Sequence, residues 1–93
     1  MQFEWDPVKA ELNLAKHGVS FDEAKSVFGD PMARMFYDYE HSFEEERNGI
    51  FGRTGSDRLI LVIFTDRFDD RIRIISAREM TPSERKKYEN ANG

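Results

Sequence analysis

Cysteine is absent from the 93 residues of this chain. Without cysteine the chain can form neither a disulfide framework nor a thiolate zinc site, and its composition fits a reducing compartment. Long apolar runs are also absent, because no stretch approaches the roughly 18 apolar residues of a membrane span. The start of the chain is acidic where a signal peptide is basic. We therefore expect a cytoplasmic protein without a membrane partner.

Repeats, low-complexity tracts and linkers rich in proline, glycine or serine are missing as well. A chain of this length has room for one hydrophobic core, since domains usually have roughly 100 residues. A hydrophobic content of 39% is enough to fill one such core. We expect a single domain that spans residues 1–93.

The motifs of several enzyme classes are not present. The chain contains no glycine-rich phosphate loop, no nucleophile elbow and no HExxH zinc motif. Its two histidines, His17 and His41, could bind a metal only together with Asp38 or Glu44, and this set has no known ligand spacing. We expect neither a metal nor a cofactor.

The net charge of −4 at first argues against a nucleic-acid ligand, because polyanion binding depends on counterions displaced by lysine and arginine. The charge is divided unevenly along the chain. Residues 1–50 hold 5 basic and 11 acidic side chains, whereas residues 51–93 hold 9 basic and 7 acidic ones. This asymmetry predicts one face for an anion and another for a basic partner. The acidic run 44–46 could bind such a partner, although a solvated turn is the simpler explanation.

Helical spacing and end signals predict a first helix over residues 7–17. Asp6-Pro7 is a strong start signal, because aspartate accepts from the free amides and proline fits the first helical position. Gly18 supplies the left-handed stop. The side chains of one stripe recur at helical spacing, namely Val8, Leu12 and Ala15.

Two further helices follow from capping-box patterns. Ser20 and Glu23 begin a helix over about 21–28 that carries an apolar stripe. Thr81-Pro82 and Glu84 begin a last helix that continues to about Asn90. The last helix has almost no apolar stripe, so it either docks on a partner or on RNA, or is a frayed end.

Alternating and apolar segments between these helices predict four strands. The strands are expected from Met32 onward, over Arg47 to Arg53, over Leu59 to Phe64 and over Ile72 to Ala77. The third run is apolar on both faces, so it should lie in the middle of the sheet and be covered on each side. Short connections favour an antiparallel meander. The expected fold is α+β, with two N-terminal helices, a four-stranded antiparallel sheet and a C-terminal helix.

Arginine is concentrated on and around the expected strands. These basic residues are Arg53, Arg58, Arg67, Arg71, Arg73 and Arg78, with Arg85, Lys86 and Lys87 on the last helix. Guanidinium groups bind phosphate in a bidentate manner and remain charged, which suits an RNA backbone and a negatively charged transition state. Each arginine could instead pair with an acid on a solvated strand edge. The cluster is therefore more informative than any single member.

Cleavage of RNA without a metal requires groups that remove the 2′-hydroxyl proton, stabilise the negative charge and protonate the leaving oxygen. The candidates for proton transfer are His17, His41, Glu79 and Tyr88, and none is singled out by spacing. His17 fits better as a capping group at the end of the first helix. Aromatic residues could form a base-stacking platform, although most are expected in the core. They are Trp5, Phe36, Tyr37, Tyr39, Phe51 and Phe64.

Several separated blocks of the sequence form one recognisable pattern. The early blocks are Phe3-Glu4-Trp5-Asp6, Asn13, Lys16-His17-Gly18-Val19-Ser20-Phe21, and Val27-Phe28 before Asp30-Pro31. The later blocks are His41-Ser42, Glu45-Glu46-Arg47, Gly52, Leu59 to Thr65, Arg67, Arg73-Ile74-Ile75-Ser76-Ala77-Arg78, and Glu84-Arg85 with Tyr88. In these blocks the sequence resembles the BrnT family of toxins. The blocks occur in order over nearly the whole chain, which makes the resemblance specific.

The resemblance implies a RelE-like ribonuclease toxin of a type II toxin-antitoxin system. Such a toxin cleaves RNA without a metal and thereby inhibits translation and growth. A BrnA-like antitoxin is expected to neutralise it. The antitoxin would carry the DNA-binding part through which the complex represses its own promoter, so that DNA is contacted only indirectly.

The resemblance also indicates site residues. Arg67, Arg73 and Arg78 match arginines that recur in the family, and we expect them to bind phosphate and stabilise the transition state. The expected RNA-binding residues are Arg53, Arg85, Lys86 and Tyr88. Strict alternation along the last strand places Arg73 and Arg78 on opposite faces unless a β-bulge intervenes.

Two alternatives belong to other functional classes. One is a non-catalytic module that binds an antitoxin in a promoter-binding, autoregulatory complex. The other is a housekeeping RNA-binding protein without a partner. Toxicity on expression favours the ribonuclease over the first alternative, and a companion gene argues against the second.

Overall fold

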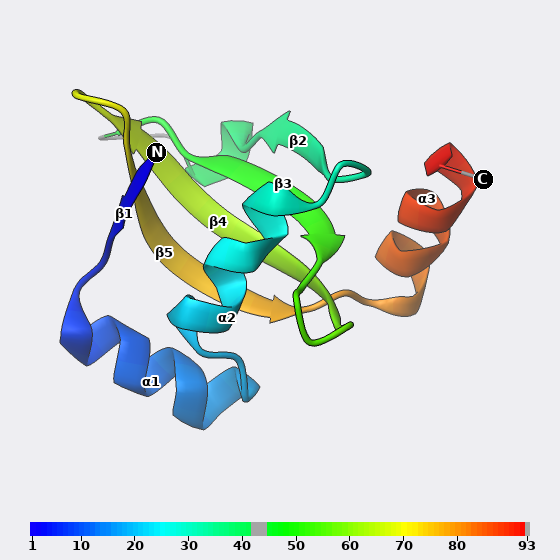
Figure 1. Ribbon diagram of the computed structural model, residues 1–93, viewed down its shortest axis with the longest axis horizontal. Coiled ribbons are helices and arrows are strands. Elements are labelled where there is room, and N and C mark those ends of the chain that lie inside the picture. Colours follow the sequence, from blue (N-terminus) through cyan, green and yellow to red (C-terminus); the bar gives the residue numbers. More distant parts are fainter. Residues whose placement is uncertain (42–44, 93) are drawn as a thin grey trace.

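A five-stranded mixed sheet forms the centre of the molecule (Figure 1). The computed structural model describes residues 1–41 and 45–92. Its elements are β1 (Gln2–Glu4), α1 (Pro7–His17), α2 (Phe21–Lys25), the 3-10 helix η1 (Ser26–Gly29), β2 (Arg34–Tyr37), the 3-10 helix η2 (Tyr39–His41), β3 (Asn48–Arg53), β4 (Leu59–Arg67), β5 (Arg71–Glu79) and α3 (Pro82–Asn92). The strand order is β1-β5-β4-β3-β2. The α+β class and the three predicted helices are confirmed.

The prediction of four antiparallel strands is wrong by one edge strand. β1 pairs in parallel with β5, with Gln2 opposite Arg71 and Glu4 opposite Arg73. The other three pairings are antiparallel, as the meander predicted. Three residues are too few to show an alternating pattern, so the sequence signal for β1 was absent.

One face of the sheet packs against α1, α2 and η1 (Figure 1). The core between them includes Phe21 and Val27 from the helices, and Val62 and Phe64 from β4. β4 is the middle strand, as predicted, but only this face of it is covered by α1, α2 and η1. The predicted second helix is tightened after Lys25 into the 3-10 turn η1. In the described part of the chain, no helix is both long enough and apolar enough to cross a membrane.

α1 turns its apolar stripe away from the core. Val8 and Leu12 are 62% and 64% exposed, whereas Asn13 is only 7% exposed. The side-chain amide of Asn13 donates to the carbonyl oxygens of Val19 and Ala77, and its oxygen accepts from the Ala77 amide. This side chain therefore satisfies the backbone of β5 at the edge that β1 leaves uncovered.

β5 contains the bulge on which the location of the arginines depends. Ile63 of β4 pairs with Ser76, and the next residue, Phe64, pairs with Ile74, so Ile75 has no partner. The extra residue shifts the alternation of β5 by one position. The core-facing residues are consequently Ile72, Ile74 and Ala77. Arg73, Ser76 and Arg78 lie on the opposite face, which we call the open face.

α3 begins with the predicted capping box and leaves the sheet beyond the end of β5 (Figure 1). The Thr81 amide donates to Glu84 Oε1, and the Glu84 amide donates to Thr81 Oγ1. Two longer-range contacts hold the helix on the sheet. Glu84 pairs with Arg78, and the Tyr88 hydroxyl donates to Asp30. α3 is therefore fixed by polar contacts more than by an apolar stripe.

Candidate active site

Arg78 lies in a hollow of the open face that has a volume of about 360 Å³. Strands β2, β4 and β5, the residues that follow β2 and precede β3, and the first turn of α3 contribute side chains to it. The lining residues are Phe36, Asp38, Arg47, Leu61, Ile63, Ser76, Arg78 and Glu84. The hollow combines two arginines and a hydroxyl group with two acids, Asp38 and Glu84, and with apolar walls. Its arginines can bind a phosphate, and its apolar walls can contact a base.

Glu84 fixes the position of the Arg78 guanidinium. Arg78 Nη1 lies 2.7 Å from Glu84 Oε1, and Nη2 lies 2.9 Å from Oε2. The hydrogen bond from Arg78 lowers the pKa of the Glu84 carboxyl, and the same bond raises the pKa of Arg78. Both groups are therefore charged at neutral pH. A bidentate pair of this kind holds the guanidinium in one orientation. Nη1 also donates to the Glu79 carbonyl oxygen, so Nε and the second hydrogen of Nη2 are the donors that remain for a ligand among the contacts of the described residues.

Arg73 lies on the same face and forms no ion pair with any residue in the described ranges. It is half-buried and lies opposite Thr65 of β4. A half-buried guanidinium without an acidic partner attracts an anion more strongly than a neutralised one. Glu4 lies opposite Arg73 in the β1–β5 pairing but forms its ion pair with Arg71. Arg73 is therefore less neutralised than Arg67 or Arg78.

Arg67 also points to the open face but is paired. Its guanidinium lies 3.7 Å from Glu45, in a second hollow of about 390 Å³. That hollow is lined by Glu45, Glu46, Thr65, Asp66, Arg67 and Phe68. Its acidic side chains make it less suited to RNA than the hollow around Arg78.

The three predicted catalytic arginines share one face but not one cluster. Arg73 and Arg78 are separated by roughly 15 Å along β5, at about 3.3 Å per residue. Arg67 pairs with Arg71, next to the Arg73 end of the strand. The structure thus places the three guanidinium groups along a track on the open face. A track of this kind fits an extended phosphate backbone better than a single phosphate.

The predicted RNA-binding residues are divided between exposed and buried sites. Arg85 and Lys86 are exposed on α3 and form no ion pair with any described residue. Arg53 is bound to Asp57 at 2.6 Å, and this hydrogen bond raises the pKa of Arg53. Tyr88 is only 6% exposed, so most of its ring is unavailable to RNA.

Tyr88 instead joins α3 to the end of η1. Its hydroxyl donates to Asp30 Oδ2 at 2.6 Å, and the same oxygen accepts from the Arg53 amide. Burial and the hydrogen bond to Asp30 raise the pKa of Tyr88. Burial by itself would raise the pKa of Asp30, but the hydrogen bonds from Tyr88, Arg53 and Met32 outweigh it and lower that pKa.

Two of the candidates for proton transfer lie away from the open face. His17 ends α1, and Glu79 lies 3.8 Å from Arg58, on the side of the sheet that packs against the helices. The side chain of His41 lies outside the described part of the chain. Among the residues that the structure describes, no group of three acidic, histidine or cysteine residues could hold a metal ion.

Sequence reasoning missed the partners that position these groups. It named Arg78 and Glu84 but not their ion pair, and it named Tyr88 but not its bond to Asp30. The capping-box pattern around Thr81 was the available signal for Glu84. No local pattern indicates the Asp30 contact, because the two residues are 58 positions apart in the sequence.

Comparisons with known proteins agree with this arrangement. Residues 5–84 match a family described as "Ribonuclease toxin, BrnT, of type II toxin-antitoxin system". The chain is similar to the 1.1 Å crystal structure of the Brucella abortus ribonuclease toxin, BrnT, with a TM-score of 0.69 and 25% identity over 87% of this chain and 97% of that chain. No significant sequence match was found among curated proteins. The chain therefore belongs to the BrnT family of ribonuclease toxins of type II toxin-antitoxin systems.

Proposed function

We propose that this ribonuclease binds and cleaves RNA on the open face of its sheet, without a metal. The observation that carries the proposal is the bulge at Ile75, because it puts Arg73 and Arg78 on one face. Arg78, held by Glu84, would bind the scissile phosphate and stabilise its developing negative charge. Arg73 and Arg67 would bind the backbone farther along the track and share in this stabilisation.

The chemical step is transfer of the phosphate to the neighbouring 2′-oxygen. The 2′-oxygen forms a bond to phosphorus and loses its proton, while the bond to the 5′-oxygen breaks and that oxygen gains a proton. Glu84 acts as a positioning residue, since it reaches the phosphate only through Arg78. Arg53, Arg85 and Lys86 contribute further contacts to the RNA backbone, and Tyr88 keeps α3 in place.

We also propose that this chain has the cellular effect and the antitoxin partner of a RelE-like toxin. RNA cleavage would inhibit translation and growth in the cytoplasm. A BrnA-like antitoxin would neutralise the toxin, and DNA would be contacted only through that antitoxin. The support for this part is the match to the BrnT family.

The test is expression under tight induction, together with cleavage assays on the purified protein in the presence of EDTA. Arg73→Gln and Arg78→Gln should each reduce RNA cleavage by about a hundredfold or more, since loss of one group that stabilises transition-state charge costs about 10²–10³ in rate. Growth arrest should disappear with them, and co-expression of a BrnA-like antitoxin should also restore growth.

Lys9→Gln is the matched control, because Lys9 is an exposed cation on α1, away from the open face. Its cleavage rate should stay within about twofold of the unmodified protein, as expected for a surface substitution away from the site. Full cleavage by both arginine variants would refute the proposed site, and loss of cleavage in EDTA would refute the metal-independent reaction.

A further inference from the structure

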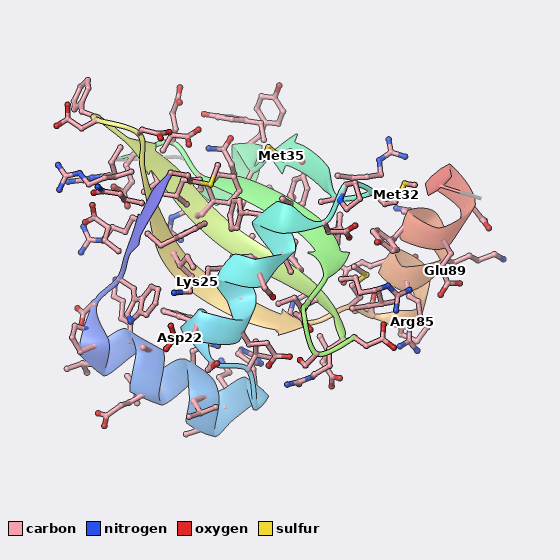
Figure 2. The ribbon with its side chains drawn as sticks, in the orientation of Figure 1. Asp22, Lys25, Met32, Met35, Arg85 and Glu89 are labelled. Carbon is pink, nitrogen blue, oxygen red and sulfur yellow. The ribbon has the colours of Figure 1, made fainter. Side chains whose placement is uncertain are left out.

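A groove with a volume of about 590 Å³ separates β2 from α3. It is lined by Arg34, Met35, Phe36, Phe51, Lys87, Tyr88 and Asn90. Figure 2 labels Met35 on the β2 side, and Arg85 and Glu89 on α3. The volume lies within the range of about 300–1,000 Å³ that is usual for small-molecule sites.

The charged groups that line this groove are all positive. Arg34 and Lys87 lie on its two sides, and the lining includes no acidic residue. Both side chains are exposed, and neither forms an ion pair with any residue in the described ranges. Cations without counter-charges around an apolar floor are complementary to a ligand that has a flat apolar part and an anionic part.

Phe36 provides a fixed aromatic surface in the groove. Its ring is 37% exposed and stacks with Phe51, with 5.2 Å between the ring centroids and 28° between the planes. The end of the ring also lies close to Gly49, where a Cβ atom would overlap Cζ and Cε1. The glycine lets the ring approach β3, so Phe36 is held firmly while more than a third of the residue remains exposed.

Phe36 also lines the hollow that holds Arg78. The groove and the hollow therefore share one side chain and lie next to each other on the open face. A phosphate bound by Arg78 would bring the adjacent nucleotide of the same strand to the groove. The groove would therefore receive the nucleotide next to the phosphate that Arg78 binds.

We propose that the groove binds one unpaired base of the RNA, stacked on Phe36, with the adjoining phosphate held between Arg34 and Lys87. The amide of Asn90 is placed to hydrogen-bond to the base edge, and Tyr88 closes the end of the groove. This inference rests on the proposed function, since it makes the groove part of the substrate site. It explains why Phe36 remains partly exposed.

The test measures binding and does not require cleavage. The probe is a fluorescent single-stranded RNA whose 2′-hydroxyls are methylated, so that it cannot be cleaved. Phe36→Leu should weaken binding about tenfold, since stacking of one base on an aromatic ring contributes about that factor or more. Phe36→Tyr keeps the aromatic face and should bind within about twofold of the unmodified protein.

A second probe separates stacking from loss of structure. It is the same RNA with abasic positions, and the unmodified protein should bind it about as weakly as Phe36→Leu binds the complete RNA. Phe36→Leu should bind the two probes equally. Equal weakening of both probes by Phe36→Leu, or no weakening of either, would overturn the proposal and leave the groove to an apolar segment of a protein partner.

The outcome is independent of the cleavage assay. If the protein cleaves RNA normally but its RNA affinity does not depend on Phe36, the proposed function stands and the base site is refuted. If RNA affinity depends on Phe36 but the protein does not cleave RNA, the base site stands and the catalytic proposal is refuted.

Discussion

Asn13 is a polar residue at a position where a helix normally presents an apolar one. Its side chain makes three hydrogen bonds, at 2.9, 2.9 and 3.1 Å, and two of them satisfy the backbone of Ala77 on β5. β1 pairs only with residues 71–73 of β5 and does not reach Ala77. The side-chain amide of Asn13 makes the hydrogen bonds to Ala77 that a neighbouring strand would otherwise make. A buried backbone group without a partner costs free energy, so the position requires a side chain that both donates and accepts.

Asn13→Leu is therefore expected to lower the free energy of unfolding by about 2–3 kcal/mol, because the Ala77 amide and carbonyl would remain buried without partners. Urea denaturation followed by the fluorescence of Trp5 measures this change. Leu12→Gln is the control on the adjacent, exposed position and should change stability by less than about 0.5 kcal/mol. A larger decrease in the free energy of unfolding for Leu12→Gln than for Asn13→Leu would contradict the orientation of α1.

Other residues show how far the sequence could predict the fold. Asp6 and Gly18 mark the two ends of α1, because caps act through local hydrogen bonds and backbone conformation. The orientation of that helix was not predictable in the same way, since the stripe containing Leu12 lies on the exposed side. The orientation of α1 is set by the hydrogen bonds between Asn13 and Ala77 of β5, which lies 64 residues later in the sequence.

The candidate site could also be predicted only in part from the sequence. Arginine at positions 73 and 78 could be recognised from residue type and from the family blocks. Whether the two share a face depends on which residue forms the bulge, and consecutive isoleucines at 74 and 75 give no local signal for that choice. The groove beside Phe36 was equally hidden, because it is formed by elements that are distant in sequence.

At the scale of elements, α3 depends on two polar contacts whose strength varies with pH. The pKa of Glu84 is lowered by Arg78, so this contact stabilises the helix fully above the ordinary glutamate value of about 4.3 and is lost as the pH falls through the lower, folded value. The pKa of Tyr88 is raised, so its contact with Asp30 is complete below about pH 10 and is lost as the pH rises through the higher, folded value.

We therefore expect α3 to separate from the sheet at both pH extremes before the sheet unfolds. Carbon-detected NMR would follow the acid transition, and α3 should lose its helical Cα shifts while β4 keeps its own. Absorbance of the phenolate would follow the alkaline one, where one of the 3 tyrosines should titrate late. Tyr88→Phe should remove that late step. Simultaneous loss of α3 and β4 would show that the two contacts do not control the helix.

At the scale of the whole molecule, the charge division of the sequence does not become a division of faces. Arg34, on the open face, comes from the acidic half of the chain. Arg67 and Arg71 come from the basic half, but they are paired with Glu45 and Glu4 of the acidic half. The expectation of one face for an anion and another for a basic partner is thus too simple. On the open face, arginines that are paired with an acid, such as Arg67 and Arg71, lie among arginines that have no ion pair with any described residue, such as Arg34 and Arg73.

The number of phosphates bound by the open face sets the salt dependence of RNA binding. With one phosphate at each of Arg67, Arg73 and Arg78 and one between Arg34 and Lys87, the logarithm of the association constant should fall with the logarithm of salt concentration with a slope of about −3, at about −0.7 per phosphate of a single strand. The slope should approach about −5 if Arg53, Arg85 and Lys86 each bind a further phosphate. Titration of the methylated RNA at several salt concentrations measures this slope. Arg73→Gln should make it shallower by about 0.7, whereas Lys9→Gln should leave it unchanged. A slope clearly shallower than about −3 would mean that fewer phosphates are bound and would contradict the proposed track.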